Sequence, residues 1–426
     1  MSAADPHGSS IWHVDRTARV RELVSGDPGM ERALVLVREN GRNCGAVAIE
    51  GTAAPESDPA VAAVPSAPRR GWREGAGATV PATVVICTTG RSDLLAASVK
   101  AVLAQDHRDY RVVVVDNAPT TGLARTALKG IDDERLTVVN ASRPGLSRAR
   151  NRGVLAATGE VVAFTDDDAI VDPHWLTALV DPFTASALVG ATTGIVLPLE
   201  LAHAPQRWFE SRGGFPKDFT PRVWAKGRIP DGVRGLGEAG EGGPLYPVAT
   251  ARVGAGVCMA LRRDVLMEVG PFDPSLGAGT PTRGGEDLDM FARVLAHGDV
   301  IVHTPDALVH HRHRVDHEGL DAQVRGNGSG MSALLTKAVL ARPSTALTLA
   351  SPAVAARLRP GSARVAGTDD DVPSGLTRSE VKGFLEGPVR YLRSRHANRL
   401  RPRKRPSSGR ADGAEGAPEG PGDGRG

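Results

Sequence analysis

The chain has 426 residues, which is long for one average domain and short for three. Its 52 basic and 49 acidic residues nearly balance, so bulk charge indicates no polyanionic partner such as nucleic acid. The three cysteines, Cys44, Cys87 and Cys258, show no Cys-x-x-Cys spacing, which argues against a zinc cluster and a disulfide framework and favours a reducing compartment. With no signal-like start and no run of about 18 apolar residues, we expect a cytoplasmic protein, at most attached to the inner face of a membrane.

Two segments are predicted before the main domain. Residues 1–50 are expected to form a small unit, because two apolar runs flank Asn40-Gly41 in a pattern typical of a hairpin. Residues 51–82 are rich in Ala, Pro, Gly and Ser with little apolar periodicity, which predicts a linker.

The main domain is predicted over residues 83–345 and has an α/β pattern. Thr83–Thr88 and Arg111–Asp116 are nearly continuous runs of β-branched residues, typical of strands buried on both faces. Apolar residues at helical spacing separate these runs, and a further strand is predicted over Val161–Thr165. This alternation indicates a mostly parallel sheet covered by helices on both faces.

Carboxylates follow two of these strands. Asp116 closes the second strand, and Asp166, Asp167 and Asp168 follow the later one. Ligands of open α/β sheets bind at this edge, and three adjacent carboxylates repel each other unless a cation offsets their charge. Oxygen ligands select Mg²⁺ or Mn²⁺. The alternatives are a solvated acidic turn for the triplet and a turn residue for Asp116.

A second acidic motif, Glu286-Asp287, lies in the first turn of a predicted helix. The helix dipole favours carboxylates there, so helix-start chemistry is one explanation of the pair. The preceding Gly284-Gly285 favours a second explanation, because glycines permit close approach of a ligand to the backbone.

Three histidines and an arginine lie within five positions after a strand-like run: His310, His311, His313 and Arg314. Alternation along a strand would place His311 and His313 on one face and His310 on the other. Imidazole can bind a metal and Arg314 can bind a diphosphate. The spacing does not tell which histidine contacts either group.

The motifs VVICTTGR, VVVVDN, GLSRARNRG and VVAFTDDD, followed by the Glu-Asp pair, occur in an order that resembles family 2 glycosyltransferases over residues 82–315. The resemblance implies the GT-A fold and transfer of a sugar from a nucleotide-diphosphate donor, with UDP foremost, to an acceptor hydroxyl. It also implies inversion at the anomeric carbon and a divalent cation, Mn²⁺ or Mg²⁺. The chain lacks the Gln-x-x-Arg-Trp motif of processive synthases, so we expect a single transfer.

The resemblance also assigns roles to individual residues. Asp287 would be the general base, with Glu286 orienting the acceptor or the base. Asp168 would hold the cation, joined by His311, and Asp167 receives no role. The nucleotide sugar would be bound by six residues: Thr88, Asp116, Arg148, Asn151, Asp166 and Arg314. Arg150, beside Arg148, is a further candidate for pairing with phosphates.

Residues 346–426 are basic and rich in Pro and Gly, which predicts a largely disordered tail. Val389–Arg405 holds eight basic residues, so the tail is either a solvated terminus or makes a weak peripheral contact with an anionic membrane or with nucleic acid. Two other functions remain open. One is a nucleotidyltransferase, although Thr88–Arg91 matches the glycine-rich triphosphate-binding loop of those enzymes only weakly. The other is a catalytically idle module that binds nucleotide sugars. The acceptor, whether glycan, lipid-linked or small molecule, is not specified.

Overall fold

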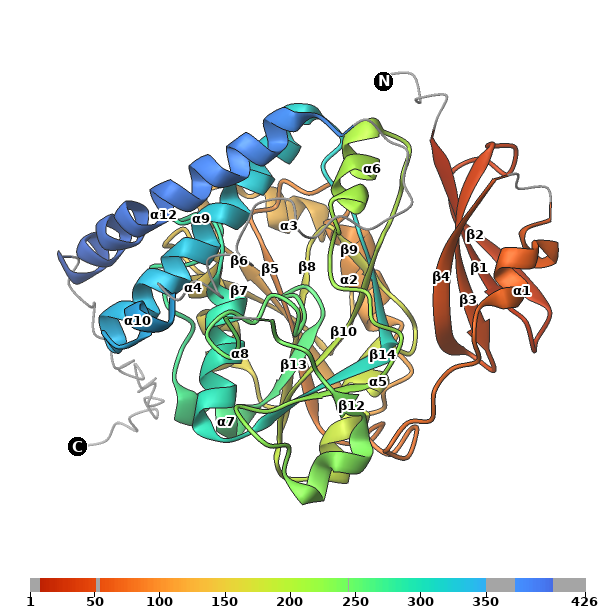
Figure 1. The fold of residues 1–426 in the computed structure, drawn as a ribbon, viewed down its shortest axis with the longest axis horizontal. Helices are drawn as coiled ribbons and strands as arrows, with labels where there is room; N and C mark the ends of the chain where they lie inside the picture. Colours follow the sequence, from red (N-terminus) through yellow and green to blue (C-terminus); the bar gives the residue numbers. More distant parts are fainter. Residues whose placement is uncertain (1–7, 51–53, 244, 350–371, 401–426) are drawn as a thin grey trace, which may run out of the picture.

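The computed structural model describes residues 8–50, 54–243, 245–349 and 372–400 and has a ten-stranded sheet at its centre (Figure 1). The strands are β5 (Ala82–Thr88), β6 (Tyr110–Asp116), β7 (Leu136–Asn140), β8 (Val161–Asp166), β9 (Ala169–Val171), β10 (Val189–Pro198), β11 (Arg222–Trp224), β12 (Glu238–Ala239), β13 (Met259–Arg262) and β14 (Val300–His311). Their order is β12-β11-β14-β10-β13-β8-β5-β6-β7, with β9 paired to β14.

The sheet is parallel where the first motifs lie and mixed elsewhere. β8, β5, β6 and β7 are all parallel neighbours, whereas β13 runs antiparallel to both β8 and β10. The parallel arrangement that was predicted is therefore continuous in the half of the sheet formed by β8, β5, β6 and β7. In that half all the carboxyl ends of the strands meet at one edge, which is where the site is built.

Helices cover both faces of the sheet, as predicted. α2 (Leu95–Leu103), α3 (Leu123–Ala127) and α5 (Trp175–Ala185) share one apolar cluster with alternate residues of β5, such as Val84 and Ile86. α4 (Leu146–Ala156), α7 (Arg263–Val269) and α8 (Glu286–His297) pack on the other face, where Val85 points. Strands buried on both faces explain the continuous β-branched runs. The remaining short elements of this domain are η2 (Pro119–Thr121), α6 (Ala204–Ser211) and η3 (Asp231–Leu236).

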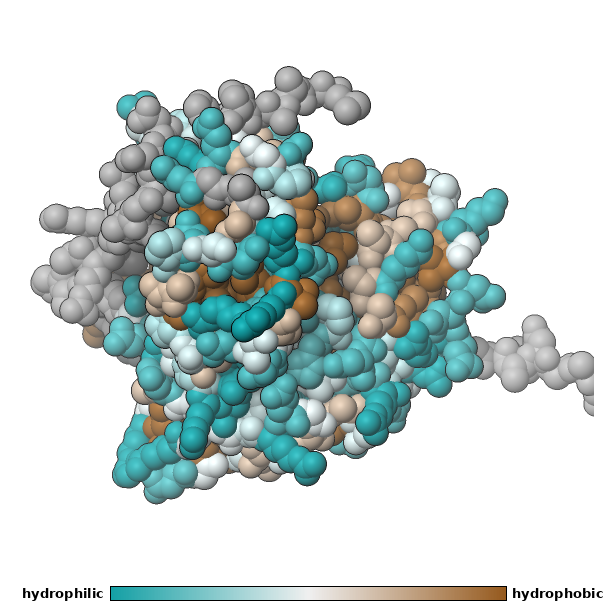
Figure 2. Space-filling model, turned by 90° about the vertical axis from the view of Figure 1, so that its right-hand side faces the viewer, coloured by the Kyte–Doolittle hydropathy of each residue, from teal (hydrophilic) through white to brown (hydrophobic). Residues whose placement is uncertain are grey.

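The N-terminal unit is a four-stranded sheet of order β2-β1-β3-β4. It consists of β1 (Ser9–Asp15), β2 (Val20–Ser25), β3 (Arg32–Glu39) and β4 (Arg42–Glu50), and is followed by η1 (Pro55–Ser57) and α1 (Pro59–Ala63). The hairpin expected at Asn40-Gly41 is its β3-β4 pair, with both turn residues at positive φ. Figure 2 shows the face of the molecule that carries this sheet; hydrophilic side chains cover most of its lower half.

The N-terminal sheet is fixed to the central sheet by apolar and charged contacts. Leu36 of β3 packs with Ile195, Leu197 and Leu308 in a buried cluster. Arg70, in the predicted linker, binds both carboxylate oxygens of Asp306 at 2.6 and 2.7 Å. The linker therefore contributes to the docking of the N-terminal unit, as well as joining it to the main domain.

The predicted disorder of residues 346–426 is wrong for residues 374–400, which form the long helix α12 (Ser374–Leu400). α12 lies along α9 (His317–Ala341), and α10 (Thr345–Leu349) follows α9 (Figure 1). Gly383 and Gly387 let the two helix backbones approach closely, because a Cβ at either position would overlap α9. Composition alone does not indicate this helix, because its contact with α9 depends on glycines and ion pairs as well as on the buried Leu376 and Tyr391. Residues 350–371 and 401–426 lie outside the described part of the chain.

Among the residues that the structure describes, no helix combines the length and the apolar character needed to cross a bilayer.

Candidate active site

Three candidate residues lie at the carboxyl ends of adjacent parallel strands. Thr88 of β5 is in register with Asp116 of β6, and Cys87 is in register with Asp166 of β8. The buried Asp116 accepts a hydrogen bond from the Ala118 amide at 2.9 Å through Oδ1, so it also shapes the turn that follows β6. The sheet thus gathers the candidate nucleotide contacts at one edge.

Asp166, Asp168 and His311 form a group that can hold a metal ion. One potential ligand atom of each lies within 4.8 Å of those of the other two. The antiparallel pairing of β9 with β14 sets His311 opposite Ala169, next to the triplet, and His311 Nε2 lies 3.1 Å from Asp168 Oδ1. Two carboxylates and an imidazole are suitable ligands for Mn²⁺, so the residues present fit the expected cation.

Electrostatics also favour a cation there. Burial raises the pKa of Asp166, Arg150 opposes this shift, and the neighbouring Asp168 reinforces it. For Asp168, burial also acts to raise the pKa, but the interactions with His311 and Arg314 outweigh it and lower that pKa. Two crowded, partly buried carboxylates carry a charge that a bound cation would offset.

Asp167 points away from this group. Its carboxylate accepts a hydrogen bond from the Thr88 hydroxyl, and its backbone carbonyl accepts bonds from Ser92 at 2.8 Å and Ser98 at 3.2 Å. Burial raises the pKa of Asp167 to about 6. Asp167 therefore fastens the triplet to β5 and α2. The Thr88 hydroxyl is used in the same network, since it also accepts from the Gly90 amide at 2.8 Å.

Arg150 joins the two acidic motifs. Its guanidinium is buried, with Nη1 2.9 Å from Glu286 Oε1 and Nη2 3.7 Å from Asp166 Oδ1. It also donates to the Gly256 carbonyl at 3.2 Å. Burial raises the pKa of Glu286 to about 7, with Asp287 adding to the shift and Arg150 opposing it. Glu286 is thus a buried partner of Arg150, which suits a positioning role better than contact with an acceptor.

Asp287 is held at the start of α8 by the backbone. Oδ2 accepts from the Gly256 amide at 2.9 Å and Oδ1 from the Leu288 amide at 2.8 Å. The side chain is only half-buried, so it remains reachable. Gly285 also serves helix packing, because a Cβ there would lie 2.7 Å from the Gly330 carbonyl oxygen of α9, whereas a Cβ on Gly284 would make only ordinary contacts with α9.

Arg148 and Asn151, both predicted to bind the nucleotide sugar, do not lie with the carboxylates. Both ends of the Asn151 amide bind the backbone of Phe272 at 2.8 Å. Arg148 bonds to the carbonyls of Pro144 and Pro274 and to Asn398 of α12. These two side chains fasten α4 to the loop before α8 and to α12. Arg150, on the same helix, lies 3.7 Å from Asp166 of the triplet.

The histidine segment divides as strand alternation predicts. His311 faces the triplet, and His313 lies on the same side, bound to Glu210 at 2.8 Å. His310 points the other way and lies 2.9 Å from His13 of the N-terminal sheet, Nε2 to Nε2. Arg314 is half-exposed at the rim, with Nη1 3.9 Å from Asp168 Oδ2. His311 is therefore the histidine placed for a metal, and Arg314 is free to reach outward.

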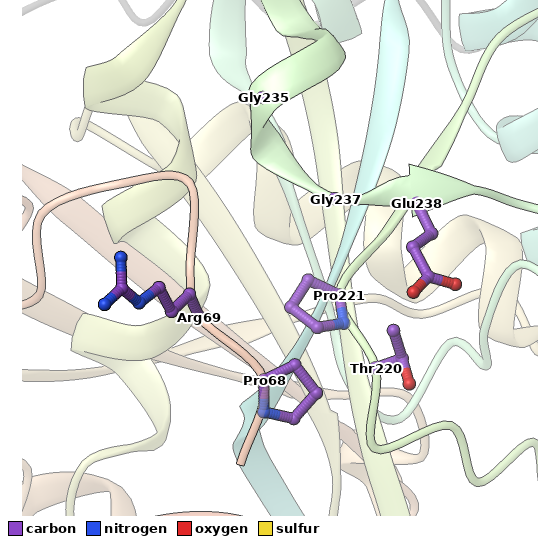
Figure 3. A pocket seen from close by; sticks show the side chains of 7 residues that line it. All are labelled: Pro68, Arg69, Thr220, Pro221, Gly235, Gly237 and Glu238. Carbon is purple, nitrogen blue, oxygen red and sulfur yellow. The ribbon is translucent and has the colours of Figure 1, made fainter.

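Two pockets lie away from this group. One of about 140 Å³ lies between the linker and β11–β12 and is lined by Pro68, Arg69, Thr220, Pro221, Gly235, Gly237 and Glu238 (Figure 3). Another of about 440 Å³ lies between the N-terminal sheet and the start of α5, and its lining includes His13 and His310. Neither contains a carboxylate of the triplet or of the Glu-Asp pair, so neither is the candidate site.

Replacing Arg150 by methionine is expected to cost about 3–5 kcal/mol of folding free energy, because it leaves Glu286 buried without its counter-charge. The loss should grow with pH. Without Arg150 the pKa of folded Glu286 rises further above its unfolded value, so folding must retain a proton that the unfolded chain releases. Melting at about pH 6 and about pH 8 tests this: a gap between variant and parent that stays constant across this range would contradict the assignment.

Comparison with known proteins gives a consistent set of matches. The model of glycosyl transferase family 2 matches residues 83–233. A glucosyl-dolichyl phosphate glucuronosyltransferase from Haloferax volcanii is 29% identical over 236 residues, which cover 54% of this chain and 68% of that protein. The succinoglycan biosynthesis protein ExoM from Rhizobium meliloti is 30% identical over 241 residues, 54% of this chain and 67% of that protein.

Among solved structures, a mannosyltransferase from Pyrobaculum calidifontis in complex with GDP-Man and Mn²⁺ has a TM-score of 0.47 at 19% identity. The match covers 74% of this chain and 90% of that one. A likeness of this size carries no argument about ligands or activity.

Proposed function

Because the chain belongs to glycosyltransferase family 2, we propose that it moves one sugar from a nucleotide-diphosphate donor, UDP-linked foremost, to an acceptor hydroxyl with inversion at the anomeric carbon. Family membership sets aside the nucleotidyltransferase alternative. The observation that carries the proposal is the grouping of Asp166, Asp168 and His311 at the sheet edge, joined through Arg150 to the Glu286-Asp287 pair.

On this proposal the donor lies along the carboxyl ends of β5, β6 and β8. The turn after β6 uses Oδ1 of the Asp116 carboxylate. The other oxygen, Oδ2, would accept a hydrogen bond from the base of the nucleotide. Asp166, Asp168 and His311 would hold Mn²⁺ or Mg²⁺, which when bound neutralises charge on the diphosphate leaving group. Arg314, at the rim beside Asp168, would contact the same phosphates. Arg148 and Asn151 are withdrawn as donor contacts because their polar groups are engaged elsewhere.

Asp287 would act as the general base. Its carboxylate takes the proton of the acceptor hydroxyl while the oxygen forms a bond to the anomeric carbon. The bond from that carbon to the diphosphate breaks on the opposite side, and the diphosphate leaves with the electron pair. Backbone amides of Gly256 and Leu288 fix the direction of the carboxylate, and the buried Arg150–Glu286 pair supports this turn of α8.

The acceptor and the location are also proposals. A glycan, a lipid-linked sugar or a small molecule each offers a suitable hydroxyl. All three cysteines are free, which agrees with the proposed cytoplasmic location at or near the inner face of a membrane.

A thermal-shift panel of UDP, GDP, dTDP and CDP, each with and without Mn²⁺, tests the proposal. Ligands that bind the folded state add to its free energy of unfolding by mass action, by about 2.7 kcal/mol at a ligand concentration of about a hundred times Kd, and so raise the melting temperature. We expect one nucleotide to stabilise the protein only when Mn²⁺ is present. Stabilisation by none of them would point to an inactive scaffold or to a donor outside this set, and stabilisation by UDP without metal would contradict the role given to Asp168.

A further inference from the structure

The outward face of α12 carries a continuous apolar and basic stripe. The residues of this outer stripe follow each other at three- and four-residue spacing and are all exposed: Arg378, Lys382, Leu385, Val389, Leu392, His396 and Arg399. Leu385, Val389 and Leu392 form its centre and are 73%, 51% and 50% exposed. Residues at this spacing share one side of a helix, so the stripe is apolar in the middle and basic at both ends.

The opposite face of α12 is fixed to the protein. Tyr391 is buried and lies 3.3 Å from Asp273, and Gly383 and Gly387 pack on the backbone of α9. Arg390 and Asn398 bond to Pro281 and Ser275, in the loop that leads to Asp287. This face of the helix is thus docked on the protein, and the side chains of the outer stripe are exposed within the part of the chain that the structure describes.

The acidic residues of α12 are used in this docking. Glu380 pairs with Arg212, and Glu386 pairs with Arg325 and Arg390. Among the exposed residues of this described helix there is no carboxylate, whereas Arg378, Lys382, Arg393 and Arg399 are all exposed. The charges on α12 are therefore distributed unevenly: its two carboxylates are in ion pairs with arginines, whereas four of its basic residues are exposed.

We propose that the outer stripe of α12 binds an anionic lipid surface. Exposed leucines and a valine can enter the boundary between headgroups and acyl chains, while the basic residues at both ends meet lipid phosphates. The sequence after Leu400 continues with Arg401, Arg403, Lys404 and Arg405, so the basic character of the segment extends beyond α12 in the sequence.

Co-sedimentation of the full chain with vesicles tests the proposal. We expect binding to vesicles that contain phosphatidylglycerol, weak binding to pure phosphatidylcholine, and release as the salt concentration rises. Leu385→Glu should weaken binding more than about tenfold, because it places a charge in the apolar centre of the stripe. Lys382→Gln should weaken it about fivefold, the effect of one basic residue near an anionic surface. The control is Met267→Glu on α7, a comparably exposed apolar residue (61%) far from α12 in Figure 1, which should change nothing.

Several results would overturn the proposal. These are equal binding to both kinds of vesicle, no binding to either, or equal losses in Leu385→Glu and Met267→Glu. Self-association in solution that Leu385→Glu abolishes would assign the stripe to a second copy of the chain instead, and RNA binding that competes with vesicles would assign it to nucleic acid. Nucleotide binding with Mn²⁺, measured on the same variants, should be unchanged, so that a failure here is separate from a failure of the proposed catalytic function.

Discussion

Replacing Asp168 by asparagine is expected to abolish the stabilisation of the protein by nucleotide in the presence of Mn²⁺. The variant removes one of three clustered ligands and the partner that orients His311 through a 3.1 Å contact. Even residues that only support metal ligands cost about 10–100-fold in metal affinity when changed, so loss of a ligand should cost at least about 100-fold. Calorimetric titration with Mn²⁺ in the presence of the preferred nucleotide measures the loss directly.

Asp167→Asn is the matched control for this result. It makes the same chemical change one residue away, but Asp167 binds Thr88 and faces away from the group that can hold a metal. We expect Asp167→Asn to retain Mn²⁺ binding within a small factor. Equal losses in the two variants would mean that the triplet acts through its total charge, and the assignment of Asp168 as a ligand would then fail.

The parts of the site that sequence patterns predicted are those set by local rules. Buried strands are continuous apolar runs, so the triplet and Asp116 could be placed at strand ends without knowing the fold around them. Alternation along β14, which ends at His311, separated His310 from His311 for the same reason. These predictions needed only the period of one element and its direction.

The choice between Arg148 and Arg150 required knowledge of which side of α4 meets the sheet. Gly153 identifies the side of α4 that meets the sheet, because a Cβ there would lie 2.3 Å from Val85 of β5. Arg150 precedes Gly153 by three residues and shares its face, whereas Arg148 does not. The signal was present in the sequence as a small residue at helical spacing. No sequence pattern indicates the contact of Arg148 with Asn398, because Asn398 lies on α12, 250 positions along the chain.

Replacing Asp287 by asparagine should lower the rate of sugar transfer by about 10²–10⁴-fold, the usual contribution of a positioned general base. Asparagine has nearly the same shape, and its one carbonyl oxygen can still accept from either Gly256 or Leu288, so the start of α8 should persist. Donor binding with Mn²⁺ should therefore be retained. Single-turnover transfer, with nucleotide binding and melting temperature measured on the same sample, separates these effects.

Glu286→Gln is the comparison variant for Asp287→Asn, because the two are expected to differ in melting temperature. Glu286 is buried against Arg150, so its amide variant leaves the guanidinium without a full counter-charge and should lower the melting temperature. Asp287→Asn should leave melting nearly unchanged while transfer is lost, because its carboxylate is half-buried and is held by the backbone amides of Gly256 and Leu288. A fully active Asp287→Asn enzyme would remove Asp287 as the base. An inactive variant with a lowered melting temperature would instead give Asp287 the same supporting role as Glu286.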